Sequence, residues 1–371
     1  MLAHDWLVGR RGGEAVLDRI ARLVLARQDR ARTPVLTMFD ACKPIGDSVD
    51  RLPRLVPELT SIPGANALRR WMLPFYPFAV ERLSDRLAEE HARDPIRLVL
   101  STSSAAIKGL RVPPGVAHVC YCHTPARYLW SQQEEYARAS PLMRLGFEMF
   151  GADLRSWDRD TSSVTLFLAN STHTAREIER CYGRPARVVH PPVRTGFFTP
   201  SDTRRTPRWL FAGAIEPYKR ADLALAAAAI AGAPLNVVGE GSQRDRLLRS
   251  PAAAVATFEA GLSDEQFRER MRTARLLVFP QIEDFGITAV EALACGTPVV
   301  ARRAGGALDF IREGQTGAFF DQPTPESLAA AAARCPDPRD PRVATACREA
   351  AIAFSEDAFD RSMESVLHEF A

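Results

Sequence analysis

The sequence predicts an α/β protein of two doubly wound domains with a cleft between them. The chain has 371 residues, more than a single hydrophobic core usually supports. Short apolar segments alternate with segments of helical periodicity through both halves, as in sheets whose strands are joined by helices. A polar stretch at residues 201–208 interrupts this alternation. We therefore expect an N-terminal domain over residues 1–198, a C-terminal domain over residues 204–352, and a final helix over residues 353–371 that packs back on the N-terminal domain.

The composition is that of a soluble globular protein, with 46% hydrophobic and 25% charged residues. A net charge of +3 at pH 7 is too small to predict nucleic-acid binding. No signal peptide opens the chain, and no apolar run approaches the ~20 residues needed to cross a bilayer. We expect a cytoplasmic protein, with attachment to the cytoplasmic face of the membrane as the alternative.

Seven cysteines are scattered along the chain without the grouping of a metal site. Cys120 and Cys122 share one face of an expected strand, but no second pair completes a tetrahedral set of ligands. Free, buried thiols in a reducing compartment explain this pattern. We expect no bound metal.

The N-terminal domain begins with a strand, a glycine-rich loop and a helix. The strand covers residues 1–7, the loop contains Gly12 and Gly13, and the helix covers residues 15–27. Glycine lets a backbone come close to a ligand, so this arrangement suits a phosphate or sugar site as well as a simple turn. Further strands are expected at residues 98–101, 116–122, 164–170 and 188–193, and a long helix at residues 141–163.

Two sets of polar residues in this domain are candidates for a site. His123 and Arg127 follow the strand at residues 116–122. A histidine at a strand exit either binds a ligand or serves the local structure, and the spacing leaves both interpretations open. Asp158 and Asp160 lie on the expected long helix about 200° apart around its axis. They cannot easily share a metal ion, so we expect them to be solvated.

Arg69 and Arg70 stand beside Trp71 in an aromatic segment that extends to Phe78. The first interpretation is that these aromatic side chains pack into the core of the N-terminal domain. The alternative is peripheral contact with the inner membrane through Arg69, Arg70 and Trp71. Aromatic rings bury at the headgroup level of a bilayer, and arginines meet anionic lipid.

The C-terminal domain restarts the alternation of strands and helices. Strands are expected at residues 209–213, 235–239, 255–260, 274–280, 298–301 and 317–320, and helices at residues 222–231, 287–296, 324–334, 342–354 and 357–370. In a sheet of this kind, ligands bind at the carboxyl ends of strands, where helix N-termini offer N–H groups and a positive dipole end.

The stretch from Glu283 to Ala301 is the centre of the expected ligand site. Glu283 lies on the loop after a strand, and Glu291 lies one turn into the next helix, with seven residues between them. The helix start between the two carboxylates supplies backbone amides. Two carboxylates that accept hydrogen bonds from hydroxyl groups, on either side of a phosphate-binding helix start, suit a sugar nucleotide.

Other residues of the C-terminal domain are expected at the same edge of the sheet. Lys219 and Arg220 lie on the loop after its first strand and are placed to neutralise a diphosphate. Gly239 lies in a Gly-Glu-Gly turn after the next strand, and Gly305 and Gly306 follow a later one.

Taken in this order, the motifs resemble those of the retaining GT-B glycosyltransferases of family four, and the resemblance covers nearly the whole chain. The His-Thr-Pro-x-Arg-Tyr and Glu-Asp-Phe-Gly-Ile variants look most like the branch that transfers mannose or related hexoses in bacterial polysaccharide assembly. The fold implied is GT-B, two Rossmann-like domains facing each other across a cleft. The matching stretches are Gly12 to Glu14, His123 to Tyr128, Leu154 to Asp158, Ala169 to Ser171, Pro191 to Val193, Glu216 to Arg220, Gly239 to Gly241 and Glu283 to Ala301.

The resemblance implies a role for each site residue. The catalytic group would be Glu283, which accepts from the donor sugar's hydroxyls, Lys219, which stabilises the diphosphate leaving group, and His123, which touches the transferred sugar. Glu291 would bind the ribose hydroxyls. The other donor-binding positions implied are Phe285, Gly286 and Ile287 through their backbone N–H groups, Gly12 and Gly13 as the wall of the N-terminal domain, and Arg220 and Gly239.

The resemblance also implies the chemistry. Transfer would proceed with retention, without a protein nucleophile or a metal, and the leaving phosphate would take the acceptor's proton. The substrates implied are a nucleotide sugar, with GDP-mannose favoured over a UDP-sugar, and a glycan or lipid-linked acceptor; no other cofactor is expected. One position departs from the family: Ala214 stands where an arginine commonly follows the strand, and Arg220 would supply some of that charge.

Other functions on this fold stay open at the level of sequence. A UDP-sugar transferase differs only in its donor, whereas an epimerase needs an additional general acid or base in the cleft. A catalytically silent homologue could serve as a scaffold. The two carboxylates also fit a double-displacement glycosidase, but the basic residues beside them favour an anionic leaving group.

Overall fold

The computed structural model describes residues 1–27, 34–57, 64–138 and 141–370. The chain forms two compact units. Unit 1 contains Met1–His190 and Asp360–Ala371, and unit 2 contains Pro191–Phe359. The division follows His190, ahead of the expected boundary at residue 198. Within the described ranges, no helix is both long enough and apolar enough to cross a bilayer.

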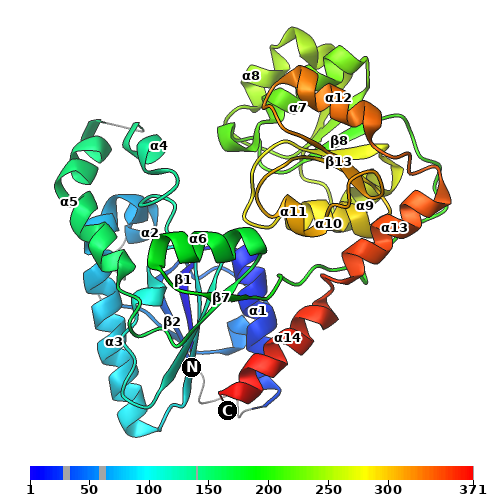
Figure 1. The fold of residues 1–371 in the computed structure, drawn as a ribbon. Coiled ribbons are helices and arrows are strands. Elements are labelled where there is room, and N and C mark those ends of the chain that lie inside the picture. Colours follow the sequence, from blue (N-terminus) through cyan, green and yellow to red (C-terminus); the bar gives the residue numbers. More distant parts are fainter. Residues whose placement is uncertain (28–33, 58–63, 139–140, 371) are drawn as a thin grey trace. The chain divides into compact units, whose positions relative to one another are not determined.

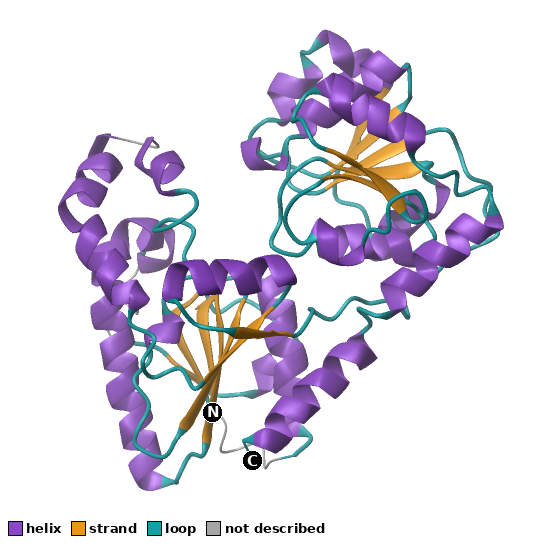
Figure 2. Cartoon of the chain, viewed as in Figure 1, coloured by secondary structure: helices purple, strands orange, loops and turns teal. Residues whose placement is uncertain are grey.

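Unit 1 is built on a parallel sheet of seven strands in the order β3-β2-β1-β4-β5-β6-β7, with helices against both faces (Figures 1 and 2). Nearly all residues of the central strands are buried, as expected for a parallel sheet that is covered on both faces. The strands are β1 Leu2–Leu7, β2 Val35–Asp40, β3 Arg54–Leu55, β4 Leu98–Ser103, β5 Ala117–Cys122, β6 Leu166–Ala169 and β7 Ala186–Val188. The helices are α1 Gly12–Leu25, α2 Ala65–Leu68, α3 Tyr76–Arg93, α4 Gln133–Arg138, α5 Pro141–Arg159 and α6 Thr172–Tyr182, and 3-10 turns include η4 Arg69–Phe75 and η5 Ile107–Gly109.

Several elements of unit 1, among them the strand β2 and the helix α3, have no counterpart among the elements expected from the sequence. The helix α3 begins at Tyr76, inside the aromatic segment, because a proline such as Pro77 is tolerated in the first turn of a helix. The last strand, β7, lies at Ala186–Val188 rather than at residues 188–193.

Unit 2 is built on a parallel sheet of six strands in the order β10-β9-β8-β11-β12-β13. Each strand falls within or beside a segment expected to be one. The strands are β8 Trp209–Ala212, β9 Leu235–Val238, β10 Ala256–Glu259, β11 Leu276–Phe279, β12 Val299–Arg302 and β13 Gly317–Phe320. The helices are α7 Ala221–Ala231, α8 Arg244–Leu248, α9 Asp264–Thr273, α10 Ile287–Ala294, α11 Ala307–Phe310, α12 Pro325–Arg334, α13 Pro341–Ile352 and α14 Glu356–Glu369, whose later part belongs to unit 1, and a 3-10 turn, η6, covers Pro217–Lys219.

In both sheets the strand order reverses beside the first strand of the unit. The reversal lies between β1 and β4 in unit 1 and between β8 and β11 in unit 2. The carboxyl ends of strands at such a point are the general position of ligand sites in open α/β sheets. Because β8 and β11 are neighbours, the loops that carry Lys219 and Glu283 leave the sheet side by side.

The end of α14 is tied to unit 1 by ion pairs. The carboxylate of Asp360 accepts hydrogen bonds from Arg19 Nε and Nη2, both at 2.7 Å, and from Arg22 Nη2 at 2.9 Å. Arg187 Nη2 donates to Glu369 Oε2 at 2.8 Å. These contacts hold the last helix against α1 and β7.

Candidate functional site

Lys219 and Glu283 meet at the carboxyl edge of the second sheet. Lys219 ends the turn η6 after β8, and Glu283 lies on the loop after β11. The ammonium group Nζ of Lys219 donates to Glu283 Oε1. The two side chains are 20% and 18% exposed, so both are open to a ligand. The structure therefore brings together two of the three residues predicted to be catalytic.

The loop that carries Glu283 is supported by the glycine pair after β12. The N–H of Gly306 donates to the carbonyl of Glu283 at 2.9 Å. A Cβ on Gly305 would stand 2.4 Å from that carbonyl oxygen, and one on Gly306 would stand 2.4 Å from Cα of Phe285. Only residues without a side chain allow the two loops to come this close.

The loop passes into α10 through Gly286. Gly286 has φ 116°, a conformation that favours glycine, and its missing Cβ leaves room for the ring of Phe279. Phe285 is buried, and its ring packs on Phe310 and Phe354 at centroid distances of 5.6 and 5.5 Å. Phe285 thus anchors the loop in the core, and Ile287 opens the helix. The first N–H groups of a helix have no partner within it, as expected for a phosphate-binding site.

Glu291 lies on the second turn of α10 and is 8% exposed. Burial raises the pKa of Glu291 to about 8, and the nearby positive charge of Arg194 opposes this rise. Within the described ranges, no hydrogen bond is made to the Glu291 carboxylate. The side chain is therefore a buried acid whose hydrogen-bonding capacity is unused.

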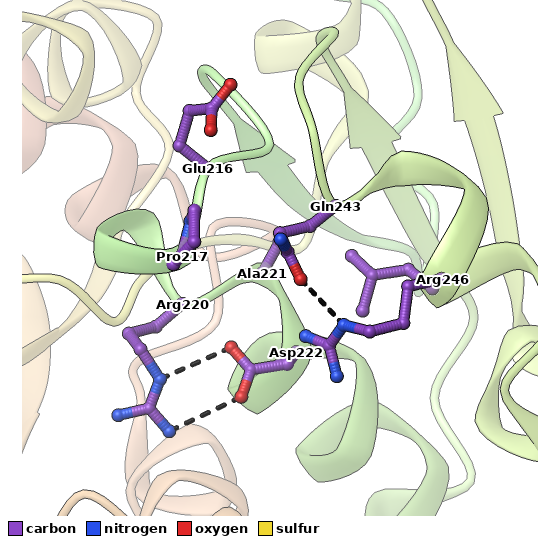
Figure 3. Close-up of a pocket in the computed structure, with 8 residues that line it drawn as sticks. Glu216, Pro217, Arg220, Ala221, Asp222, Gln243 and Arg246 are labelled. Atoms are coloured by element: carbon purple, nitrogen blue, oxygen red, sulfur yellow. Dashed lines mark hydrogen bonds and ion pairs between the residues drawn. The ribbon is translucent and has the colours of Figure 1, made fainter. Parts of the chain in front are cut away.

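Arg220 is engaged away from the Lys219–Glu283 pair. It has φ 55° and pairs with Asp222 through Nε at 3.2 Å and Nη2 at 3.4 Å. Both side chains line a pocket of about 260 Å³ with Gln243 and Arg246 (Figure 3). Neither Lys219 nor Glu283 lines that pocket. In this structure the partner of Arg220 is Asp222. The expected binding of the diphosphate by Arg220 stays a prediction.

The turns after β8 and β9 touch backbone to backbone at Gly239. A Cβ on Gly239, which has φ 146°, would stand 2.0 Å from the carbonyl oxygen of Gly213. Glu216, in the β8 loop, accepts hydrogen bonds from the Ser242 N–H at 3.0 Å and hydroxyl at 2.6 Å. Gly239 thus sets the approach of these loops. Ala214, at the position where the family commonly has arginine, is exposed.

In unit 1, Gly13 and His123 meet at the carboxyl edge of the first sheet. A Cβ on Gly13 would stand 3.5 Å from His123 Nε2. The ring is partly exposed, but its Nε2 atom is buried and has no hydrogen-bond partner among the described residues. Burial lowers the pKa of His123 to about 3, with a further contribution from His4. His123 is therefore a neutral imidazole with an unused nitrogen beside the Gly12–Gly13 turn.

The residues that shape this edge include two without an expected role. His4 Nδ1 lies 2.5 Å from Thr102 Oγ1. Asp5 accepts hydrogen bonds from four successive backbone N–H groups, those of residues 104–107, at 2.5 to 2.9 Å. Asp5 thereby fixes the turn after β4. The only feature of the sequence that pointed to His4 and Asp5 was their position near the end of the first strand.

The expectation that Asp158 is solvated is wrong. Asp158 is fully buried and forms an ion pair with Lys108, which is 2% exposed. Its second oxygen accepts from Trp130 Nε1 at 2.7 Å and from the Tyr182 hydroxyl at 3.1 Å. Asp160 lies beyond the end of α5 and is exposed. Because Trp130 ends the loop that begins at His123, Asp158 anchors that loop.

Comparison with known proteins finds a family match within the second unit. Residues 201–351 match the family model described as glycosyl transferases group 1. The D-inositol 3-phosphate glycosyltransferase of Acidothermus cellulolyticus is 32% identical over 209 residues, which are 48% of this chain and 47% of the relative. A second enzyme of that name, from Catenulispora acidiphila, is 32% identical over 251 residues, 56% of this chain and 59% of the relative. The chain thus spans about half the length of the curated relatives it matches.

Solved structures show the fold of the whole chain. Anabaena HepE, in complex with UDP and glucose, superposes with a TM-score of 0.70 at 18% identity, covering 99% of this chain and 98% of its own. Sucrose-phosphate synthase from Thermosynechococcus elongatus gives a TM-score of 0.74 at 17% identity, covering 100% of this chain and 98% of its own. The chain therefore has the GT-B fold of two Rossmann-like domains, and its residues 201–351 are similar to the glycosyl transferases group 1 family.

Proposed function

We propose that the chain is a retaining hexosyltransferase that moves a sugar from a nucleoside diphosphate sugar to a glycan or lipid-linked acceptor. The contact between Lys219 and Glu283 carries the proposal, because it lies beside the helix start at Gly286. An ammonium group and a helix N-terminus suit a diphosphate, and a carboxylate suits the hydroxyls of a sugar. The family match of residues 201–351 supports the same class of reaction.

A bound donor substrate would replace the contact between Lys219 and Glu283. Phosphate oxygens would accept from Lys219, and sugar hydroxyls would donate to Glu283. Lys219 would exchange the carboxylate for phosphate oxygens, and Glu283 would exchange the ammonium group for sugar hydroxyls. Neither side chain would be left without a hydrogen-bond partner in a partly buried site. In this role Glu283 positions the sugar and transfers no proton.

Glu291 suits the ribose of the donor. Two neighbouring hydroxyls can donate to its two oxygens, and these hydrogen bonds favour the charged carboxylate. The buried carboxyl group has a raised pKa and no hydrogen-bond partner among the described residues. It would gain two hydrogen bonds when the ribose binds. The neutral ring of His123 would likewise bond a sugar hydroxyl through Nε2.

Transfer with retention follows if the leaving diphosphate and the incoming hydroxyl share one face of the sugar. The C1–O bond to the phosphate breaks, the C1–O bond to the acceptor forms, and the acceptor's proton passes to the departing phosphate oxygen. Lys219 and the start of α10 would stabilise the charge that develops on that oxygen. This scheme uses neither a protein nucleophile nor a metal.

The donor we favour is GDP-mannose, and a UDP-sugar is the alternative. The preference for GDP-mannose rests on the motif variants at His123 and Glu283, whereas the solved structure of HepE contains UDP and glucose. With Ala214 in place of the family's arginine, Lys219 carries more of the diphosphate charge in either case.

A thermal-shift panel of GDP-, UDP- and ADP-sugars tests the proposal. A ligand at about 100 times its Kd stabilises the native state by about 2.7 kcal/mol. We expect one nucleotide class to raise Tm by several degrees, and Lys219→Ala to remove most of that rise. The matched control, Lys43→Ala, removes an exposed lysine of unit 1 and should leave the shift intact.

Four other results would redirect or refute the proposal. If UDP-sugars alone raised Tm, a UDP-sugar would be the donor in place of GDP-mannose. A shift without transfer to any acceptor would favour the silent homologue, and interconversion of the free nucleotide sugars would favour the epimerase. If no nucleotide sugar stabilised the protein, the donor site itself would be rejected.

A further inference from the structure

Unit 1 carries a concentration of exposed apolar side chains on two segments. Seven of the thirteen large hydrophobic side chains that are exposed among the described residues lie there, with exposed fractions between 41% and 61%. We call them the apolar patch. Its members are Leu68, Trp71, Phe75 and Phe78 on α2, η4 and the start of α3, and Leu145, Met149 and Phe150 on α5.

The exposed side chains of the first segment follow its helical spacing. Leu68 and Trp71 are three residues apart, as are Phe75 and Phe78, and three residues make one turn of a 3-10 helix. Leu73, between the two pairs, and Tyr76, within the second pair, are buried. The segment therefore carries apolar side chains on its solvent face as well as in the core.

The two segments are neighbours that pack on one hydrophobic core. Leu73 and Tyr76 of the first segment and Phe147 and Leu154 of α5 are members of the same buried cluster. Figure 1 shows α5 beside α2. Each segment turns its inner side chains to this core and its exposed ones away from it.

The apolar patch flanks the carboxyl edge of the first sheet. The ring of Tyr76 packs against Trp6 and Phe39, at the ends of β1 and β2, with centroid distances of 6.4 and 6.0 Å. It also packs against Tyr128, in the loop that begins at His123, at 6.4 Å. In addition, Asn66 Nδ2 donates to the carbonyl of Asp40, at the end of β2, at 2.8 Å.

The charge of the first segment complements an anionic surface. Residues 64–80 contain Arg69 and Arg70 and no acidic residue. On α5, Arg144 is exposed next to Leu145 but pairs with Glu148 at 3.0 Å, so the unbalanced positive charge is that of residues 64–80. Tryptophan and phenylalanine insert at the headgroup level of a bilayer, and nearby arginines are attracted to anionic lipid.

We propose that the apolar patch docks unit 1 on an anionic lipid bilayer, with the carboxyl edge of its sheet close to the lipid headgroups. A lipid-linked acceptor would then present its head beside the Gly13–His123 edge. That second statement rests on the proposed function, whereas the docking itself does not. The packing interpretation holds for Leu73 and Tyr76 but not for Trp71, Phe75 and Phe78, which are exposed.

Vesicle co-sedimentation of the full chain tests the docking. We expect binding to vesicles of phosphatidylcholine and phosphatidylglycerol, and much weaker binding to phosphatidylcholine alone. The double variants Phe75→Ser with Phe78→Ser, and Arg69→Glu with Arg70→Glu, should each weaken binding about tenfold or more. The matched control, Ile230→Ser with Ile352→Ser, removes two exposed isoleucines of unit 2 and should bind like the parent.

A second measurement keeps the test independent of variant folding. Trp71 is 47% exposed, and its fluorescence should be quenched by brominated lipid in anionic vesicles. Trp71→Phe should lose most of that quenching and still bind. Donor-induced stabilisation, measured without lipid, should be unchanged in every patch variant, so that failure of docking and failure of the donor site are told apart.

Specific results would overturn the docking proposal. Absence of binding to anionic vesicles, or equal binding by the parent and both patch variants, would reject it. A dimer that is lost in Phe75→Ser with Phe78→Ser would assign the apolar patch to a second copy of the chain instead.

Discussion

The two glutamates of the candidate donor site differ sharply in environment. Glu283 is partly exposed and paired with Lys219, whereas Glu291 is buried with a pKa raised to about 8. Sequence spacing indicated that both glutamates accept hydrogen bonds from hydroxyls, but it does not predict how deeply each one is buried. That difference gives the two residues distinct pH behaviour.

Donor affinity should therefore depend on pH through Glu291. Hydroxyl donors bind the charged carboxylate best, so the buried acid must lose its proton when the ribose binds. Affinity should fall by up to about tenfold per pH unit as the pH drops below about 8. Calorimetry with an intact nucleotide sugar between pH 6 and pH 8, roughly the range just below that pKa, measures this slope.

The variant Glu291→Gln supplies the control for this slope. It keeps the shape of the side chain but removes its ionisation, so its affinity should be lower at high pH and nearly independent of pH. An equal slope in the variant would assign the pH dependence to another group. Unchanged affinity at high pH would reject Glu291 as the ribose ligand.

At the scale of elements, the donor edge depends on close contact between loops. The loop from Glu283 to Gly286 lies against Gly305 and Gly306 so tightly that a methyl group cannot fit. Motif spacing located these glycines at the correct edge. Their function as a backbone support for the Glu283 loop needed the structure, because the two loops come from different strands, β11 and β12.

Gly306→Ala should displace the Glu283 loop. Gly306 has φ −67°, which alanine adopts without strain, so the effect is purely steric. We expect a loss of stability of about 1–3 kcal/mol from overpacking, together with a clear loss of donor affinity. Denaturant unfolding and the donor-induced thermal shift measure the two effects.

Gly196→Ala is the matched control for this substitution. A Cβ at Gly196, also in unit 2, would meet nothing within 4 Å. It should therefore leave both stability and donor affinity near the parent values. If Gly306→Ala behaved like Gly196→Ala, the supporting role of the Gly305–Gly306 turn would be wrong.

At the scale of the whole molecule, the chain returns to its first unit at the end. Residues 360–371 belong to unit 1, although the whole of unit 2 separates them in sequence from α1. The contact depends on Asp360, which receives three hydrogen bonds from Arg19 and Arg22. Arg19 and Asp360 are only 13% and 16% exposed, so solvent screens their pair weakly.

Asp360→Asn should weaken unit 1. The substitution removes the carboxylate charge that faces the largely buried guanidinium of Arg19, at a cost of about 1–3 kcal/mol. Denaturant unfolding followed by a probe in unit 1 measures this loss. Glu364→Gln, which neutralises an exposed carboxylate of the same helix, should leave the transition within about 0.5 kcal/mol of the parent. Equal stability of the two variants would contradict a role for the Asp360 pair.

The sequence by itself determined the α/β class, most strands and helices, and the edge at which Lys219, Glu283 and Gly286 gather. These follow from local periodicity and from the rule that parallel strands end at one edge. It did not reveal β2 or α3, the burial of Asp158 with Lys108, or the exposure of Trp71, Phe75 and Phe78. Whether a charge is solvated or an aromatic ring is buried depends on which distant segments pack against it. That information exists only in the tertiary structure.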